Sequence, residues 1–472
     1  MSLLLVVPVA GAAAAPVSPT VTAVAGAPSI AGHTSFDLST VGYEQSEHFL
    51  QGSATAYAPT APLLADGRWD VAPSTSAPYV TRVVVNRPIH PREFNGTVVV
   101  EWLNVSGGLD ASPEWMQAHV ELIRGGYAWV GVTAQAVGLN ALRASSAELP
   151  GGSGSRYASL SHPGDSYSYD MFSQAGQAVR DHARTMFGGL SPERVLAAGE
   201  SQSAGRLVTY IDAVHPLAGV YDGFLVHSRG AGAAALTQDP LPVVAAPSPT
   251  FVRDDLDVPV LVFQTESDTS GLQARRADTA RFRLWEVAGT AHYDQYGLAL
   301  GATDDGGLAH AVEAFEAMRT PSAGFGCALP INAGPATYVV RAAVAALHTW
   351  VAEGAPPPRA PRLELSTSDP VQYAADAQGN ARGGIRTPAV DAPVAVLGGL
   401  GNTGTGPVGQ FCRLFGTTVP LTPEQLVARY GDQHGFAAAW KRATRAARRA
   451  GFLRPADARM LGAIPGETIV IP

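Results

Sequence analysis

The sequence predicts an α/β fold, in which helices cover both faces of a mostly parallel central sheet. From about residue 43 to residue 360, short apolar or β-branched runs alternate with helical stretches, which is the pattern of strands joined by crossover helices. The run over residues 97–103 is apolar almost throughout, as expected for a strand that is buried on both faces. The chain has 472 residues, of which 46% are hydrophobic and 15% charged, so it can bury a large core.

The individual elements follow from the same patterns. Strands are expected where β-branched and aromatic residues cluster, over 79–85, 97–103, 127–132, 194–198, 223–227, 259–263 and 283–287. Helices are expected where apolar residues recur at helical spacing, over 114–124, 169–185, 204–214 and 338–353. Gly- and Pro-rich loops over 135–167 and 228–257 are expected to form the walls of a pocket.

Composition divides the chain into three parts. Residues 1–35 are expected to be a signal-like leader and linker, because the apolar run 3–15 resembles a secretory h-region with a small-residue cleavage site, although no basic residue precedes it. A disordered leader is the alternative. Residues 36–359 form the expected core, and residues 360–472 form an extension that packs on it. We therefore expect a secreted or periplasmic protein without an integral membrane segment.

The chain contains two cysteines, Cys327 and Cys412, which are too few for a disulfide-rich scaffold. In an exported protein they are expected to form one bridge that ties the extension to the core. Two buried thiols are the alternative, and neither residue stands on a strand-to-helix turn where a nucleophile would be expected.

The strongest chemical signal is the segment Gly199-Glu200-Ser201-Gln202-Ser203-Ala204-Gly205. A predicted buried strand runs into it and a predicted helix follows at once, which is the setting of a nucleophile elbow. The sharp turn lifts the serine hydroxyl above the sheet edge, next to the positive end of the helix dipole. We therefore expect Ser201 to be the nucleophile. Because Ser203 stands where glycine is usual, Ser203 remains a second candidate, and an ordinary serine-rich helix cap remains the structural alternative.

A nucleophilic serine needs a general base, and this arrangement places the base after the last strand of the sheet. The predicted strand 283–287 is followed by Ala288-Gly289-Thr290-Ala291-His292, so we expect His292 to be the base. His162 precedes the nucleophile in the chain, His215 lies at a helix end, and His227 closes a strand, where it would only line the pocket.

The acid that orients the histidine is expected after the strand 259–263, where two carboxylates are available. Asp268 is favoured by its distance from the strand and by the 24 residues that separate it from His292. Glu266, which lies closer to the end of the strand, remains the rival. The order serine, acid, histidine is the order used in this kind of fold.

An oxyanion hole needs two backbone amides that point at one position. The amide of Gln202, directly after the nucleophile, is expected to supply one. The other is expected from the loop Asn104-Val105-Ser106-Gly107-Gly108, in which Asn104 or Val105 is the candidate donor. A plain glycine turn is the alternative interpretation of this loop.

The elbow, the acid loop, the segment Trp285–His292 and the tail phrase Gly379-Asn380-Ala381-Arg382-Gly383-Gly384-Ile385-Arg386 resemble a family of large, often exported bacterial α/β-hydrolase-domain proteins related to carboxylesterases. The resemblance covers residues 45–470. It implies the α/β-hydrolase fold, hydrolysis of esters and a tail that is a family feature rather than an independent domain.

The expected function is cleavage of carboxylic esters through an acyl-enzyme on Ser201, with His292 as base and Asp268 or Glu266 as acid. The same residues would also serve a peptidase, a lactonase or an acyltransferase, and a binding module that kept the fold without activity is the alternative of another class. No cofactor or metal is expected, because the histidines lack a metal-binding spacing such as HExxH. A small-molecule ester is the expected partner.

Charge argues against one further class of partner. The net charge of −8 gives nucleic-acid binding no support. The cations within residues 436–452 suggest attachment to a surface, but a solvated helix face is the simpler interpretation. The sequence leaves the oligomeric state and the ester specificity open.

Overall fold

The structure is a computed structural model that describes residues 17–26, 34–148 and 156–471. The expected leader, with its cleavage site near Ala13–Ala15, lies largely outside the described residues. Within the described part of the chain, the helices are too short or too polar to cross a bilayer.

A nine-stranded sheet forms the centre of the molecule, with the strand order β1-β2-β3-β5-β4-β6-β7-β8-β9. The six strands from β5 to β9 in this order are parallel, and β1, β2 and β3 extend the sheet in antiparallel fashion. The expected mostly parallel sheet is therefore confirmed. The strands are β1 (Thr20–Ala23), β2 (Tyr43–Pro59), β3 (Val71–Pro88), β4 (Thr97–Trp102), β5 (Ala128–Val132), β6 (Arg194–Glu200), β7 (Gly223–His227), β8 (Val260–Thr265) and β9 (Phe282–Val287).

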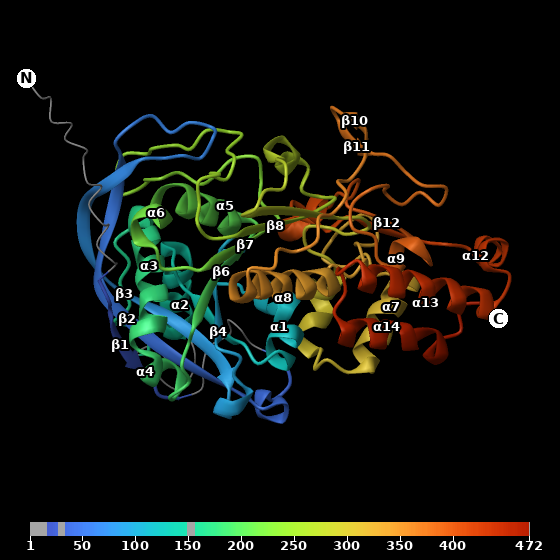
Figure 1. The fold of residues 1–472 in the computed structure, drawn as a ribbon, viewed down its shortest axis with the longest axis horizontal. Helices are drawn as coiled ribbons and strands as arrows, with labels where there is room; N and C mark the ends of the chain where they lie inside the picture. The colour runs from blue at the N-terminus through green and yellow to red at the C-terminus, as the bar shows by residue number, and fades with distance from the viewer. Residues whose placement is uncertain (1–16, 27–33, 149–155, 472) are drawn as a thin grey trace, which may run out of the picture.

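Helices cover both faces of this sheet (Figure 1), because each buried strand sends alternate side chains into two apolar cores. Val98 and Val100 of β4 lie in the core shared with α3 and α5, whereas Val99 lies in the core shared with α1 and α8. The helices of this region are α1 (Pro113–Arg124), α2 (Ala136–Glu148), α3 (Ser168–Asp181), α4 (Ala183–Phe187), α5 (Gln202–Thr209), α6 (His215–Ala218), α7 (Leu308–Arg319) and α8 (Thr337–Glu353).

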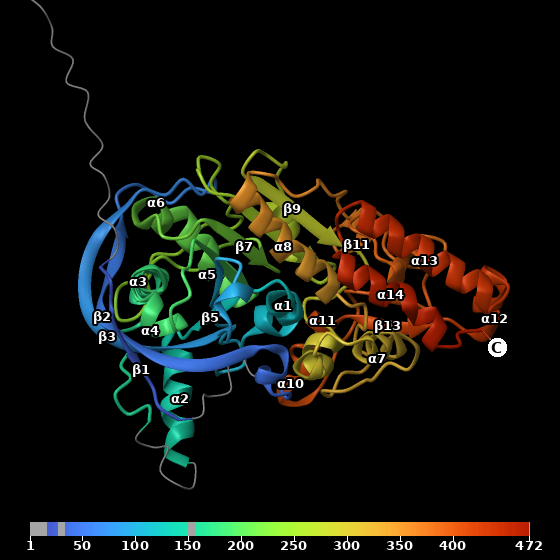
Figure 2. The same cartoon turned by 60° about the horizontal axis from the view of Figure 1, so that its bottom comes forward.

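Three segments differ from the expectations. The long hairpin β2–β3, which curves around α3 and α4 (Figure 2), includes a strand that the sequence patterns did not predict. Polar residues are frequent in β2 because it lies near the edge of the sheet and is only partly buried. The loop expected over 135–167 begins with helix α2, in which Leu139 is buried against Tyr157 and Leu160. Residues 20–23, within the expected leader and linker, form the edge strand β1.

The C-terminal extension lies at the end of the molecule opposite to the β2–β3 hairpin (Figure 1). Its helices α13 and α14 pack with α7 around a third apolar core, which contains Phe315, Phe436 and Trp440. Its remaining elements are β10 (Leu365–Ser368), β11 (Val371–Tyr373), α9 (Pro388–Asp391), β12 (Ala395–Gly398), α10 (Gly406–Gly409), α11 (Cys412–Phe415), β13 (Thr417–Pro420), α12 (Pro423–Tyr430), α13 (Gln433–Arg449) and α14 (Pro455–Glu467).

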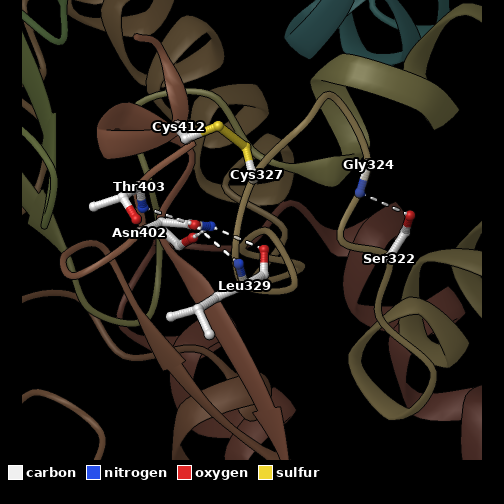
Figure 3. Close-up of a disulfide and its surroundings, with 8 residues drawn as sticks. Ser322, Gly324, Cys327, Leu329, Asn402, Thr403 and Cys412 are labelled. Atoms are coloured by element: carbon white, nitrogen blue, oxygen red, sulfur yellow. Dashed lines mark hydrogen bonds between the residues drawn. A yellow bond between two sulfur atoms is a disulfide. The ribbon is translucent and has the colours of Figure 1, made fainter. Parts of the chain in front are cut away.

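A disulfide joins Cys327, in the loop after α7, to Cys412 at the start of α11 (Figure 3). Next to it, the side chain of Asn402 accepts a hydrogen bond from the amide of Leu329 at 3.2 Å and donates one to the carbonyl of Leu329 at 3.1 Å. The expected bridge between the core and the extension is thus present, and side-chain hydrogen bonds reinforce it.

Candidate active site

The elbow brings Ser201 to the carboxyl end of the central strand β6. Ser201 has φ 61° and ψ −117°, a strained conformation for a residue other than glycine, and α5 begins at the next residue. Gly199 makes the turn possible, because a Cβ atom there would lie 3.1 Å from the carbonyl oxygen of Ser203. The strand-turn-helix setting expected from the sequence is therefore present.

The loop after β9 places His292 against Ser201. The Nε2 atom of His292 lies 2.7 Å from the hydroxyl oxygen of Ser201, and its Nδ1 atom lies 2.6 Å from Oδ1 of Asp268. With the neutral imidazole protonated on Nδ1, the ring donates to Asp268 and accepts from the Ser201 hydroxyl. Three residues from three different strand ends therefore form one continuous chain of hydrogen bonds.

The second oxygen of Asp268 is also fully engaged. Oδ2 accepts hydrogen bonds from the amide of Thr265 at 2.7 Å, from the hydroxyl of Thr265 at 2.8 Å and from the hydroxyl of Ser228 at 2.8 Å. Burial opposes ionisation, but His292 and these donors outweigh it and hold the pKa of Asp268 below its usual value. Asp268 is thus kept as a carboxylate whose position is fixed.

Glu266, the rival acid, points elsewhere. Its carboxylate accepts hydrogen bonds from the amide of Gly289 at 2.5 Å and from the amide of Gly399 at 2.9 Å. Burial raises the pKa of Glu266 to about 7. The structure therefore brings Asp268 to His292, and it uses Glu266 to join the acid loop, the histidine loop and the C-terminal extension.

The expected oxyanion donors are the backbone amides of Gln202, Asn104 and Val105, and they differ in whether they already donate a hydrogen bond. Gln202 is the first residue of α5, where a backbone N–H has no acceptor within the helix. The amide of Asn104 instead donates to the carbonyl of Ala111 at 2.9 Å, so this expected oxyanion donor is already engaged. Its side chain donates to the carbonyl of Glu200 at 2.9 Å. In the described part of the chain no residue accepts from the amide of Val105 or from that of Gly107, whereas the amides of Ser106 and Gly108 are bonded within the loop. Of the two expected donors in this loop, Val105 is therefore the one whose amide is free.

Sequence reasoning overlooked Glu200, the residue directly before Ser201. Its side chain is only 5% exposed, and its Oε1 atom lies 3.4 Å from Nε2 of His292. Burial raises the pKa of Glu200 to about 7. The signal in the sequence was a charged residue inside the elbow. Burying a carboxylate is costly unless the carboxylate is paired with an opposite charge or accepts hydrogen bonds.

The charges around His292 determine its basicity. Burial lowers the pKa of His292, but the carboxylates of Asp268 and Glu200 more than offset this and raise it to about 9. Of the other histidines, His227 pairs with Glu114 at 2.9 Å, and His162 lies against the carbonyl of Ala134. Over the residues that the structure describes, acidic, histidine and cysteine side chains do not gather into a group that could hold a metal ion.

The sequence matches the family described as "Alpha/beta hydrolase domain" over residues 7–463, which is nearly the whole chain. Comparison with curated proteins gave no match.

Solved structures resemble the chain only remotely. A fungal esterase from Rhizomucor miehei is 12% identical with a TM-score of 0.25, and the match covers 46% of this chain and 66%, just under two thirds, of that esterase. A putative dienelactone hydrolase from Klebsiella pneumoniae is 14% identical with a TM-score of 0.26, over 50% of this chain and 85% of the other. Acetyl xylan esterase 1 from Thermoanaerobacterium sp. is 9% identical with a TM-score of 0.30, over 57% of this chain and 81% of the other.

Proposed function

The chain belongs to this alpha/beta hydrolase family, and from that premise we propose that it is a serine hydrolase that cleaves carboxylic esters. The chain of hydrogen bonds from Asp268 through His292 to Ser201, at 2.6 and 2.7 Å, is the main support for the proposal. It joins a nucleophile, a base and an orienting acid with the geometry that acyl transfer requires.

In the proposed reaction, the Ser201 oxygen attacks the ester carbonyl while Nε2 of His292 takes the hydroxyl proton. Asp268 accepts from Nδ1–H and stabilises the imidazolium that forms. The amides of Gln202 and Val105 donate to the oxyanion of the tetrahedral intermediate.

The intermediate then collapses as His292 gives its proton to the leaving alkoxide, which departs as the alcohol. Water repeats the sequence on the acyl-enzyme: it loses a proton to His292, attacks the acyl carbon and releases the carboxylic acid, and Ser201 regains its proton. Each proton taken by His292 is returned within the same half-reaction, so no further reactant is needed.

Turnover of p-nitrophenyl esters by Ser201→Ala and Ser203→Ala variants tests the proposal. Ser203 is the matched control, because its hydroxyl is buried and bonded to the carbonyl of Glu200 at 2.8 Å. We expect Ser201→Ala to lower kcat by about 10⁴- to 10⁶-fold, and Ser203→Ala to lower it by less than about tenfold. Esters of increasing acyl length, with aminoacyl amides beside them, would define the substrate class. Equal activity of the Ser201→Ala variant and the wild type would refute the proposal.

A further inference from the structure

The carboxylate of Glu200 occupies an unusual position at the end of β6. Its Oε1 atom lies 3.4 Å from Nε2 of His292, on the same nitrogen that contacts Ser201. Oε1 is buried, and throughout the described ranges no residue donates a hydrogen bond to it. A buried acceptor without a donor costs free energy, so its retention needs a reason.

A second carboxylate–imidazole pair lies next to Glu200, where His227 of β7 is the register partner of that residue. His227, at the end of the neighbouring strand β7, contacts Oε1 of Glu114 at 2.9 Å through Nδ1. Glu114 comes from the first turn of α1, and its Oε2 atom is also buried, with no hydrogen-bond partner among the described residues. Burial raises the pKa of Glu200, whereas the charges of both His292 and its register partner His227 lower it.

The charged and titratable groups around Glu200 and His292 come from several elements. Those that act on His292 are Asp268 from the loop after β8, Glu200 from β6 and Arg413 from α11. Those that act on Glu200 are His292, His227, Glu114 and Asp268. Burial raises the pKa of Tyr293, the residue after the histidine, and the charge of Glu200 raises it further.

We propose that Glu200 is a positioning residue for the esterase reaction, acting as a second carboxylate on the Nε2 side of His292. The inference rests on the proposed function, because it assigns Glu200 a role only if His292 is the base. Asp268 fixes the Nδ1 side of the ring, and Glu200 places a negative charge beside the nitrogen that receives the serine proton.

This arrangement stabilises the imidazolium that forms when Ser201 attacks. The hydroxyl of Ser201 lies closer to Nε2, at 2.7 Å, than Oε1 of Glu200 does, at 3.4 Å, so Glu200 attracts the charged ring while Nε2 exchanges its proton with Ser201. The proton therefore still passes from Ser201 to His292 and on to the alkoxide. The two carboxylates raise the pKa of His292, so the neutral form that acts as base becomes more populated as the pH rises.

The pH dependence of inactivation by a fluorophosphonate tests this role without knowledge of the natural ester. The second-order rate requires neutral His292, so it rises with pH through the pKa of that histidine and falls away below it. Because Asp268 and Glu200 raise the pKa of His292 to about 9, the midpoint of the wild-type protein is expected to lie well above pH 7. We expect Glu200→Gln to lower this midpoint by about one unit or more, because a negative neighbour is lost.

Glu266→Gln is the matched control. Glu266 is an equally buried glutamate whose pKa is also raised to about 7, but it bonds to Gly289 and Gly399 rather than to His292. Its midpoint is expected to stay at the wild-type value even where its stability falls. Glu200→Asp keeps the charge but withdraws it by one methylene, so it should lower the midpoint by less than Glu200→Gln does. If thermal melting shows that Glu200→Gln is unfolded, Glu200→Asp takes its place in the test.

The possible failures are distinguishable. If wild-type protein is not modified at Ser201 at any pH, the proposed function falls and the role of Glu200 with it. If wild-type protein reacts normally but the folded Glu200 variants keep the wild-type midpoint, or Glu266→Gln shifts it equally, only the role of Glu200 is overturned.

Discussion

Glu266 and Asp268 stand two residues apart in one loop, but their carboxylates have opposite environments. Asp268 is held ionised by His292 and by three hydrogen-bond donors, whereas burial raises the pKa of Glu266 to about 7. The spacing from the strand was enough to favour Asp268 in the sequence, but only the fold reveals that Glu266 binds the amides of Gly289 and Gly399.

This difference predicts unequal effects of two isosteric substitutions. Asp268→Asn should lower kcat by about 10⁴-fold, because the amide cannot hold the Nδ1–H tautomer of His292. Glu266→Gln should retain far more activity and show its main effect as a lower melting temperature, since one of two amide hydrogen bonds loses its acceptor. Steady-state kinetics and thermal melting of both variants provide the test, and a larger loss of kcat in Glu266→Gln would reverse the assignment of the acid.

Two other features of individual residues in the site, the hydrogen bond of the Asn104 amide and the position of Glu200, could not be predicted from the sequence. The amide of Asn104 was one of the two expected oxyanion donors of its loop, but it pairs with the carbonyl of Ala111 in an isolated bridge that no local pattern predicts. The role of Glu200 was hidden because it fills a variable position of the elbow, and its neighbour His292 is 92 residues away in the chain. Contacts of this kind depend on how strand ends meet.

At the scale of elements, the sequence predicted the parts of the sheet that are buried on both faces. Strands β4, β6, β7, β8 and β9 were predicted from clusters of apolar and β-branched residues, and residues 223–227 match β7 without a shift. Strand β2 was missed because it is polar and partly exposed, and α2 was missed because Gly and Ser around it suggested a loop. The three catalytic candidates could be placed because each follows one of the well-predicted strands.

The extension contributes directly to the loops of the site. Gly399 donates to Glu266, the hydroxyl of Tyr373 donates to the carbonyl of Glu266 at 2.8 Å, and the amide of Tyr293 donates to the carbonyl of Leu414 at 3.4 Å. Residues far along the chain thus hold the acid loop and the histidine loop in place, which is why the extension cannot be regarded as an accessory to the core.

Gly399 is where this support is tightest, and it gives a prediction at the element scale. A Cβ atom on residue 399 would lie 2.4 Å from Cβ of Glu266 and 2.6 Å from its carbonyl carbon. Gly399→Ala should therefore displace the acid loop, destabilise the protein by about 1–3 kcal/mol and lower kcat. Denaturant unfolding and ester turnover measure the two effects.

Gly462 is the matched control, because it lies in α14 with no heavy atom within 4 Å of an added Cβ. Gly462→Ala should be neutral or stabilise by up to about 1 kcal/mol, as expected for alanine in a helix. Similar stability and activity in both variants would argue against a role of Gly399 in holding the acid loop.

At the scale of the whole molecule, the core and the extension are joined by apolar packing and by one disulfide. The disulfide between Cys327 and Cys412 spans 85 residues and lies in a cluster with Ile331 and Phe415, which Tyr293 contacts next to the histidine. A cross-link of this kind persists in oxidising compartments.

Loss of this cross-link should be measurable. A Cys327→Ser/Cys412→Ser variant is expected to lose about 2–4 kcal/mol in free energy of unfolding, because a long loop is no longer closed in the unfolded chain. Guanidinium titration with and without reductant measures this loss. Reductant should shift the unfolding midpoint of the wild-type protein toward that of the variant and leave the midpoint of the variant unchanged. If the wild-type midpoint does not respond to reductant and equals that of the variant, the disulfide does not contribute to stability.

The central claim is that the distant segments of the chain converge to make Ser201 a nucleophile. Its most direct test is to locate a fluorophosphonate adduct on the intact protein by mass spectrometry. The expected result is one adduct per chain, with fragment ions that place it on Ser201 rather than Ser203, and none on a folded Ser201→Ala variant. An adduct on any other residue, or one that persists in Ser201→Ala, would contradict the claim.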